Sequence, residues 1–244
     1  MSIRDLTAHN DQDLPALEGV SLDVRAGEIV GLAGVSGNGQ RELAEAVAGL
    51  RHATGGEVSI DGKNILREPV AARLRAGLAY IPEERNRDGV IGSFSVAENT
   101  ILQNHTAYAR GIFFDFGAIN RHAANLIRRF NIKTPSGQTP AKNLSGGNIQ
   151  KLILARELAR KPSVLIAAQP TRGVDISATE YIHRVLIDQR SAGVAILLIS
   201  EDLDEILALS DRIAVIYEGQ IVGILDRQDA DVEVLGLMMA GVNA

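Results

Sequence analysis

Uninterrupted apolar stretches constrain the fold of this chain more than any other feature of its sequence. Two such stretches among the 244 residues are Val164–Ala167 and Ala195–Ile199. Strands of this composition are covered on both faces, as in a parallel sheet flanked by helices. A third run, Glu28–Ala33, is followed by helical spacing from Arg41 to Leu50. This alternation predicts an α/β fold with a largely parallel central sheet.

Two further parts of the chain are expected to differ from that central sheet. Ser2–Leu6 and Val20–Val24 predict a small antiparallel sheet near the start of the chain. Residues 94–160 have the spacing of helices and predict a helical subdomain inserted between strands. Its aromatic cluster, which we expect to be core rather than docking surface, comprises Phe113, Phe114 and Phe116. Residues 1–93 and 161–244 would then form the α/β core with its antiparallel β subdomain.

The composition narrows the possible functions. The chain has no cysteine, which excludes disulfides and thiol chemistry, and its net charge of −5 argues against a nucleic-acid partner. Its apolar runs are far shorter than the ~20 residues that cross a bilayer. Residues 1–11 lack the apolar core of a signal peptide. We therefore expect a chain that is soluble by itself and reaches a membrane only through a partner.

A glycine-rich loop follows the third apolar run. The spacing G-x-x-x-x-G from Gly34 to Gly39 turns backbone N–H groups inward at the start of a helix, where they can bind a phosphate. Such a loop continues with Lys and then Ser or Thr, but this chain has Gln40 and Arg41. Loss of the lysine should weaken phosphate binding roughly 10- to 100-fold, because a charged hydrogen bond contributes ~1.5–3 kcal/mol. An ordinary strand–turn–helix joint stays open as the alternative. The nucleotide-binding residues predicted here are Gly34, Ser36, Gly37, Asn38, Gly39, Gln40 and Arg41.

The string LSGGNIQ at residues 144–150 is more specific. Ser145 can cap a helix that begins near Gly147, and the two glycines expose N–H groups for a phosphate. At this string the chain resembles the ATP-binding cassette ATPases of ABC transporters, whose signature motif contacts the γ-phosphate of ATP held by the partner domain. The resemblance implies the family fold, a P-loop NTPase-like core with a small antiparallel β subdomain and an inserted helical subdomain. It implies the signature role for Leu144, Ser145, Gly146, Gly147 and Gln150.

Other landmarks of that family occur in order but with altered residues. The family places Asp and Glu after a strand, where Asp supports Mg²⁺ and Glu polarises the attacking water. This chain has Ala168 and Gln169 there, and Glu201 where the family has a histidine. Glu83 replaces the usual glutamine of the loop that leads to the helical subdomain, and no aromatic residue precedes position 80 to stack on adenine. Asp175 matches the loop that touches the opposite subunit, which implies a dimer contact.

The departures fall on one side of the machinery. The groups that are missing would supply charge, metal support, nucleophile activation and adenine stacking at the chain's own loop. The signature and Asp175, which are retained, would serve ATP held by the partner. Phosphoryl transfer depends on positioning and on charge stabilisation by such groups. We therefore expect no intact catalytic residue and no metal ligand at the chain's own loop. The degenerate positions are Gln40, Arg41, Ala168, Gln169 and Glu201.

A closer likeness is carried by GVSGNGQREL, IPEERNRDGV, SVAEN, NLSGGNIQKL and AAQPTRGVDI. These strings resemble the second of two cassette domains found in one polypeptide in importers of sugars and nucleosides. The likeness implies an intact cassette and membrane permease subunits as partners, with ATP and Mg²⁺ at the shared partner site, on the cytoplasmic face of the membrane. Glu83, Arg85 and Asp88 are then expected to meet the permease. Two alternatives stay open: an active ATPase that uses Arg41, Gln169 and Glu83, and a soluble cassette protein outside transport.

Overall fold

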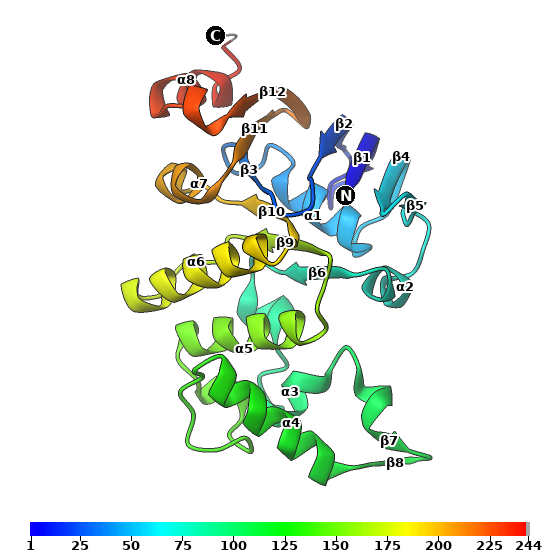
Figure 1. Cartoon of the computed structure of the whole chain (residues 1–244). Helices are drawn as coiled ribbons and strands as arrows, with labels where there is room; N and C mark the ends of the chain where they lie inside the picture. Colours follow the sequence, from blue (N-terminus) through cyan, green and yellow to red (C-terminus); the bar gives the residue numbers. More distant parts are fainter. Residues whose placement is uncertain (243–244) are drawn as a thin grey trace. The chain divides into compact units, whose positions relative to one another are not determined.

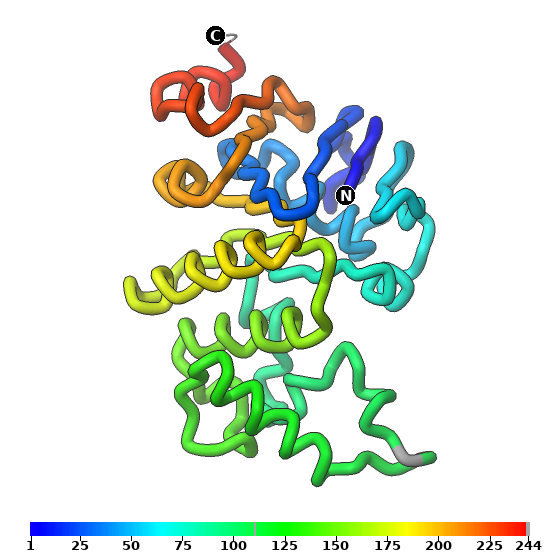
Figure 2. Tube along the Cα trace, in the orientation of Figure 1, coloured from blue at the N-terminus to red at the C-terminus, as the bar shows by residue number. Residues whose placement is uncertain are grey.

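The computed structural model describes residues 1–242 (Figure 1). The chain forms two compact units, of which unit 1 comprises Met1–Tyr80, Pro162–Gln169 and His183–Ala244, and unit 2 comprises Ile81–Lys161 and Pro170–Ile182. The chain leaves unit 1 and returns to it twice, a path that can be followed along the trace (Figure 2). The subdomain boundaries expected at residues 94 and 160 stay a prediction. Within residues 1–242 no helix has the length and apolar character needed to cross a membrane.

A six-stranded sheet forms the centre of unit 1. Its strands are β3 Ile29–Ala33, β6 Leu78–Ile81, β9 Val164–Ala168, β10 Ala195–Ile199, β11 Arg212–Tyr217 and β12 Gln220–Asp226. They lie in the order β12-β11-β3-β10-β9-β6, with β3, β9, β10 and β11 parallel to one another and β12 in a hairpin with β11. Every residue of β9 and β10 is buried. The predicted parallel sheet of strands covered on both faces is therefore confirmed.

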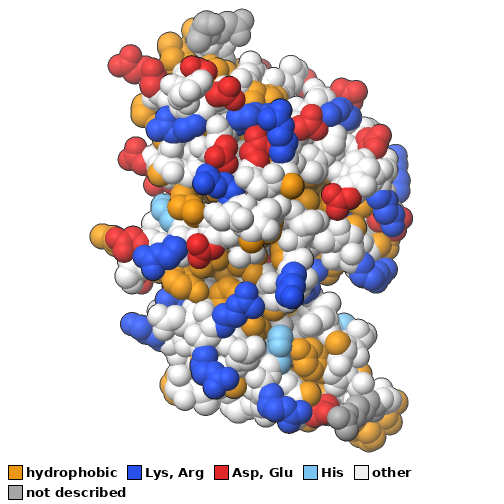
Figure 3. All heavy atoms as spheres, in the orientation of Figure 1, with side chains coloured by type: hydrophobic (Ala, Val, Ile, Leu, Met, Phe, Trp, Pro, Cys, Tyr) orange, Lys and Arg blue, Asp and Glu red, His pale blue; other side chains and the backbone are white. Residues whose placement is uncertain are grey.

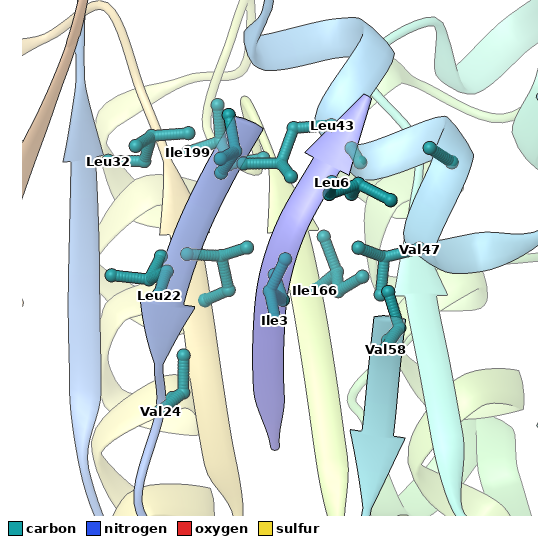
Figure 4. Close-up of a cluster of buried hydrophobic side chains, with 14 of the residues drawn as sticks. Ile3, Leu6, Leu22, Val24, Leu32, Leu43, Val47, Val58, Ile166 and Ile199 are labelled. Carbon is teal, nitrogen blue, oxygen red and sulfur yellow. The ribbon is translucent and has the colours of Figure 1, made fainter. Parts of the chain in front are cut away.

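A second sheet of unit 1 is antiparallel, as predicted. Its strands are β1 Ser2–His9, β2 Pro15–Asp23, β4 Ala53–Ile60 and β5 Lys63–Asn64, in the order β2-β1-β4-β5. Helix α1 Gln40–Ala48 contacts strands of both sheets, β1 and β2 on one side and β9 on the other. One apolar core is thereby shared by the two sheets and α1, with Leu43 and Val47 of α1 facing Ile166 and Leu6 (Figure 4).

The remaining helices of unit 1 are short. They are α2 Val70–Arg75, α7 Leu203–Leu209, α8 Val232–Met239 and the 3-10 turn η4 Arg227–Asp229. Helix α7 packs closely on β3 at Gly31. A Cβ atom added to Gly31 would lie only 3.0 Å from Ile206 Cγ2, a side-chain atom of this helix. A glycine in β3 therefore allows the helix to cover this face of the sheet.

Unit 2 is mostly helical. Its elements are the π-turn η1 Arg85–Gly89, α3 Val96–Ile101, η2 His105–Tyr108, β7 Ala109–Arg110, β8 Phe113–Phe114, α4 Phe116–Arg129, η3 Ala141–Asn143 and α5 Gly146–Ala159. Helix α6, Ile176–Ser191, begins in unit 2 and ends in unit 1. A small core cluster of buried side chains in this unit consists of Ala97, Ile101, Ile119 and Ala123.

The aromatic cluster predicted as core is exposed instead. Phe113 and Phe114 belong to the two-residue strand β8, and the exposed fractions of Phe113 and Phe116 are 73% and 62%. The hairpin β7–β8 turns at Gly111, whose φ is +64°. The prediction that these rings are core was therefore wrong, because the hairpin holds them in solvent and the buried cluster of the unit is formed by Ala97, Ile101, Ile119 and Ala123 instead.

Candidate functional site

The glycine loop joins β3 to α1 in unit 1. Gly37 and Gly39 have φ angles of +90° and +103°, which L side chains rarely adopt. A Cβ atom on Gly39 would also lie 2.6 Å from the carbonyl oxygen of Ala16. The N-cap residue of α1 is Gly39, which has no side chain to cap the helix, and the first N–H groups of a helix have no partner within the helix. The backbone of this loop is therefore compatible with a bound anion.

The side chain of Gln40 lies within this loop rather than in solvent. It is 8% exposed, and its Nε2 donates a hydrogen bond to the carbonyl oxygen of Val35 at 3.0 Å. Asn38 donates to the same oxygen at 2.9 Å, and its Oδ1 accepts from the N–H of Glu218 at 2.7 Å. Neutral amides thus hold the loop, and Gln40 brings no positive charge to a phosphate.

Arg41 is the next cation along the chain, and it is directed toward carboxylates. Its Nε donates to Glu45 Oε1 at 2.7 Å, and its Nη1 lies 3.5 Å from Asp11 Oδ2. Glu45 also pairs with Arg51 at 2.7 Å. Arg41 therefore stabilises a surface ion-pair network around α1, where the phosphate-binding pattern requires a hydroxyl.

The structure brings the other positions predicted to be degenerate, namely Ala168, Gln169 and Glu201, to the edge of the sheet where the loop begins. Ile199 of β10 pairs with Leu32 of β3 and with Ala168 of β9. Because these strands are parallel, the residues that follow them emerge at the same edge. Gln169 has a φ of +48°, and its Oε1 accepts a hydrogen bond from the N–H of Glu201 at 3.4 Å. Gln169 and Glu201 are thus adjacent.

These residues do not fit Mg²⁺ held beside a nucleotide. Mg²⁺ takes carboxylate oxygens, phosphates and water in octahedral geometry, but Ala168 has no oxygen in its side chain and Gln169 is neutral. Over residues 1–242 no three His, Asp or Glu side chains converge into a possible cation site. No catalytic step therefore follows at the chain's own loop.

The signature string begins helix α5 in unit 2. Ser145 has the N-cap backbone conformation, with φ −66° and ψ 157°, and is exposed. The predicted side-chain cap is wrong, because Ser145 Oγ accepts from Asn148 Nδ2 at 2.8 Å and no side chain caps the helix. The side-chain amide of Asn148, about one turn along the helix, thus binds the Ser145 hydroxyl in place of a backbone N–H group. The first N–H groups of α5 are consequently left without a side-chain acceptor.

The side chains of Leu144 and Gln150 in the signature are buried. Leu144 is 9% exposed and Gln150 is 1% exposed. The Nε2 of Gln150 has no hydrogen-bond partner among the described residues. A buried donor of this kind costs ~1–3 kcal/mol when it stays unpaired. The Nε2 of Gln150 is therefore a signature donor that the described residues leave available.

Asp175 caps the beginning of α6 in unit 2. Its Oδ1 accepts from Ser177 Oγ at 2.6 Å and from the N–H of Ala178 at 2.9 Å. The hydrogen bond from Ser177, with that from Ala178, lowers the pKa of Asp175. A Cβ atom on Gly147 would lie 2.9 Å from Ala178 Cβ, so this glycine brings the signature against the start of α6. The dimer contact expected of Asp175 stays a prediction.

The loop expected to meet the permease is tied within unit 2. Glu83 forms an ion pair with Arg172, and Arg85 donates hydrogen bonds to the carbonyl oxygens of Arg172 and Gly173, the second at 2.8 Å. Asp88 is exposed and pairs with Arg87 at 2.8 Å. The role of Arg172 could not be predicted, because a charge run such as residues 83–88 is typical of a solvated loop.

Charge is distributed unevenly between the two units. Unit 2 has thirteen Lys and Arg against eight Asp and Glu, a net charge of +5, whereas unit 1 has twelve against twenty-two, a net charge of −10. Lys and Arg side chains are prominent on the face of unit 2 seen in Figure 3. The whole-chain charge of −5 therefore conceals a basic unit, and it is weaker evidence against anionic partners than the sequence suggested.

Comparison with known proteins agrees with this geometry. The model of the family described as ABC transporter matches residues 17–172. The glucose import ATP-binding protein TsgD13 of Haloferax volcanii is 46% identical over 242 residues, covering 98% of this chain and 44% of the relative. The guanosine import ATP-binding protein NupO of Bacillus subtilis is 43% identical over 243 residues, covering 99% of this chain and 48% of the relative. The chain thus spans about half the length of the curated relatives it matches.

Solved structures resemble the chain in fold. A nucleotide-free ATP-binding cassette from an ABC transporter superposes with a TM-score of 0.80 at 20% identity, covering 97% of each chain. A dimeric cassette in a post-hydrolysis state with ADP and Pi gives a TM-score of 0.77 at 21% identity, covering 93% of this chain and 98% of the other. The α/β cassette fold is therefore confirmed, and the chain belongs to the ABC transporter family.

Proposed function

We propose that this chain is the non-hydrolysing cassette of an importer and completes the ATP site of a partner cassette. The observation that carries the proposal is the state of the chain's own loop. The side-chain amide of Gln40 donates its hydrogen bond to the carbonyl oxygen of Val35, Arg41 is paired with Glu45, and Ala168 has no side-chain atom that can bind a metal. These positions bring neither a cation nor a carboxylate to a nucleotide, so weak or absent ATP binding is expected there.

The signature end of the chain supports the complementary role. Ser145 is exposed, the first N–H groups of α5 have no side-chain acceptor, and Gln150 retains an unused donor. Helix N-termini favour anions through these N–H groups and the helix dipole. We therefore assign Leu144, Ser145, Gly146, Gly147 and Gln150 to the γ-phosphate of ATP held by the partner, with Mg²⁺ supplied at that partner site.

The relatives suggest the solute class and the partners. Their names state import of glucose, guanosine and nucleosides, and we propose sugars or nucleosides as the transported class. Because the chain spans about half of each relative, the intact cassette is proposed to belong to the same longer polypeptide. The remaining partners would be membrane permease subunits. The net charge of +5 on unit 2 suits a place near the anionic cytoplasmic face of the membrane.

The alternative of an active ATPase is not favoured by the contacts. Arg41, Gln169 and Glu83 would have to supply the missing chemistry. Each of these side chains is already hydrogen-bonded or ion-paired, to Glu45, to the N–H of Glu201 and to Arg172 respectively. A soluble cassette protein outside transport is not favoured either, because the relatives listed above carry import names over 98% or more of this chain.

Calorimetric titration of the chain with Mg-ATP tests the silent loop. The wild-type chain should bind weakly, and the double substitution Gln40→Lys with Arg41→Ser should tighten binding by at least about 10-fold, because it restores a charged hydrogen bond to phosphate. The pair leaves the net charge unchanged, so general attraction cannot explain a gain. Gln40→Ala serves as the control and should not tighten binding. Wild-type affinity equal to that of the double variant would refute a silent loop.

A further inference from the structure

Residues 83–89 form an unusual turn in unit 2. Residues Arg85–Gly89 are a single π-turn, and the N–H groups of Arg87 and Asp88 both donate to the carbonyl oxygen of Glu84, at 3.1 and 2.8 Å. Turns of this kind are rare and occur frequently at functional sites. The segment therefore has a defined shape although its composition is that of a solvated loop.

The far end of the turn is fixed to helix α5. Arg156 Nη1 donates to the carbonyl oxygen of Gly89 at 2.8 Å. A Cβ atom on Gly89 would collide with Ile153 Cδ1, so only glycine lets the turn approach the helix this closely. Arg156 itself is 6% exposed and pairs with the fully buried Glu157 at 3.0 Å. The segment and the helix that follows the signature are thus packed as one piece.

The near end of the turn is fixed to the loop 171–175 by Arg85. Its guanidinium donates to two successive carbonyl oxygens, those of Arg172 and Gly173. The Glu83–Arg172 ion pair adds a second attachment between the same two segments. A planar guanidinium can serve two carbonyl oxygens at once, whereas the single ammonium of lysine sits at the end of a flexible chain.

The same guanidinium lies against the signature. A Cβ atom on Gly146 would be 2.9 Å from Arg85 Nη2, and one on Gly173 would be 3.3 Å from that atom. Glycine at both positions therefore leaves the space through which Arg85 reaches the loop 171–175. The cluster of segments 83–89, 144–150 and 171–175 is thus built around one side chain.

We propose that Arg85 is a positioning residue that makes the signature and the loop 171–175 follow the movement of the segment 83–89. The inference rests on the proposed function, in which the segment meets a permease and the signature meets the partner's ATP. It differs from the expectation that Arg85 itself touches the permease, because both terminal nitrogens are directed to backbone carbonyls of the loop. A displaced segment would then displace the signature with it.

Hydrogen exchange of the chain tests the local contact without reference to transport. The peptide 171–179 contains the protected N–H groups of Val174, Ala178 and Thr179. Arg85→Gln should raise exchange in this peptide by about 10-fold, because two charged hydrogen bonds are lost. Arg85→Lys should also raise it, since one ammonium cannot replace the fork. Arg87→Gln is the matched control, exposed in the same turn, and should leave this peptide unchanged. Unchanged exchange in both Arg85 variants would overturn the proposal.

Coupling in the assembled transporter provides the functional readout. Arg85→Lys and Arg85→Gln should lower the ratio of solute-stimulated to basal ATP hydrolysis by at least about 5-fold, the lower end of typical coupling between two sites. A role in folding alone would lower both rates together and keep the ratio, which would contradict the inference. If the ratio is kept while Ser145→Arg abolishes hydrolysis, the positioning role fails and the proposed function stands. If Ser145→Arg leaves hydrolysis intact, the proposed function fails, and hydrogen exchange still decides the contact.

Discussion

Replacing Ser145 by arginine is expected to lower ATP hydrolysis by the assembled transporter at least about 100-fold, the loss that accompanies removal of one well-placed donor from a developing charge. Ser145 occupies the N-cap of α5 and is exposed, with its hydroxyl held by Asn148 at 2.8 Å. A long side chain at this position would fill the space in which a phosphate approaches the first N–H groups of the helix. Phosphate release from the reconstituted transporter measures the effect.

A second variant controls for the positive charge that Ser145→Arg adds to unit 2. Asn125→Arg places the same side chain at an exposed position of α4, outside the signature string. This variant should leave the hydrolysis rate unchanged, because exposed substitutions of this kind rarely alter stability. An equal loss in both variants would mean that added positive charge on unit 2, rather than obstruction of the signature, explains the result.

The largest effect on stability is expected at Arg73 in unit 1. This side chain is 4% exposed and donates to four carbonyl oxygens, those of Ala46, Val47, Leu66 and Glu68, at distances of 2.6 to 2.9 Å. Burial lowers the pKa of Arg73, and the four hydrogen bonds offset the cost of the buried charge. Arg73→Ala leaves these carbonyls unpaired and should lower the free energy of unfolding by about 3–4 kcal/mol. Urea denaturation measures the change.

A second arginine of the same helix provides the control for the Arg73→Ala substitution. Arg75 lies two residues along α2 and is exposed. Arg75→Ala should change the free energy of unfolding by less than about 0.5 kcal/mol, as is usual for exposed positions. A loss below about 1 kcal/mol for Arg73→Ala would show that water replaces the guanidinium at those carbonyls, and the stabilising role assigned to Arg73 would be wrong.

Hydrophobic pattern and turn residues were sufficient to predict the fold of unit 1. The runs at Val164–Ala167 and Ala195–Ile199 are buried strands because every residue is apolar, and Glu218-Gly219 turns β11 into β12 as such a pair should. The pattern missed residues 109–114, where two short strands form a hairpin inside a stretch expected to be mostly helical. Two-residue strands are too short to produce a period, so no sequence pattern could have indicated them.

The site was predictable in residue type but not in contacts. Glycine spacing indicated the loop at Gly34–Gly39, because glycine at fixed positions has a backbone cause, and the resemblance to ABC ATPases indicated the signature at 144–150. It could not indicate that Gln40 binds Val35 or that Arg85 crosses to Gly173. The second of these bonds joins residues 88 positions apart in the chain, and both depend on packing that local pattern does not encode.

The central claim is that this chain serves its partner's ATP and not its own. The most direct measurement compares the hydrolysis rates of Ser145→Arg and Gln40→Ala in one transporter preparation. We predict that hydrolysis is lost in Ser145→Arg and unchanged in Gln40→Ala, since Gln40 already contributes no charge to its loop. Loss of hydrolysis in Gln40→Ala with hydrolysis retained in Ser145→Arg would contradict the claim.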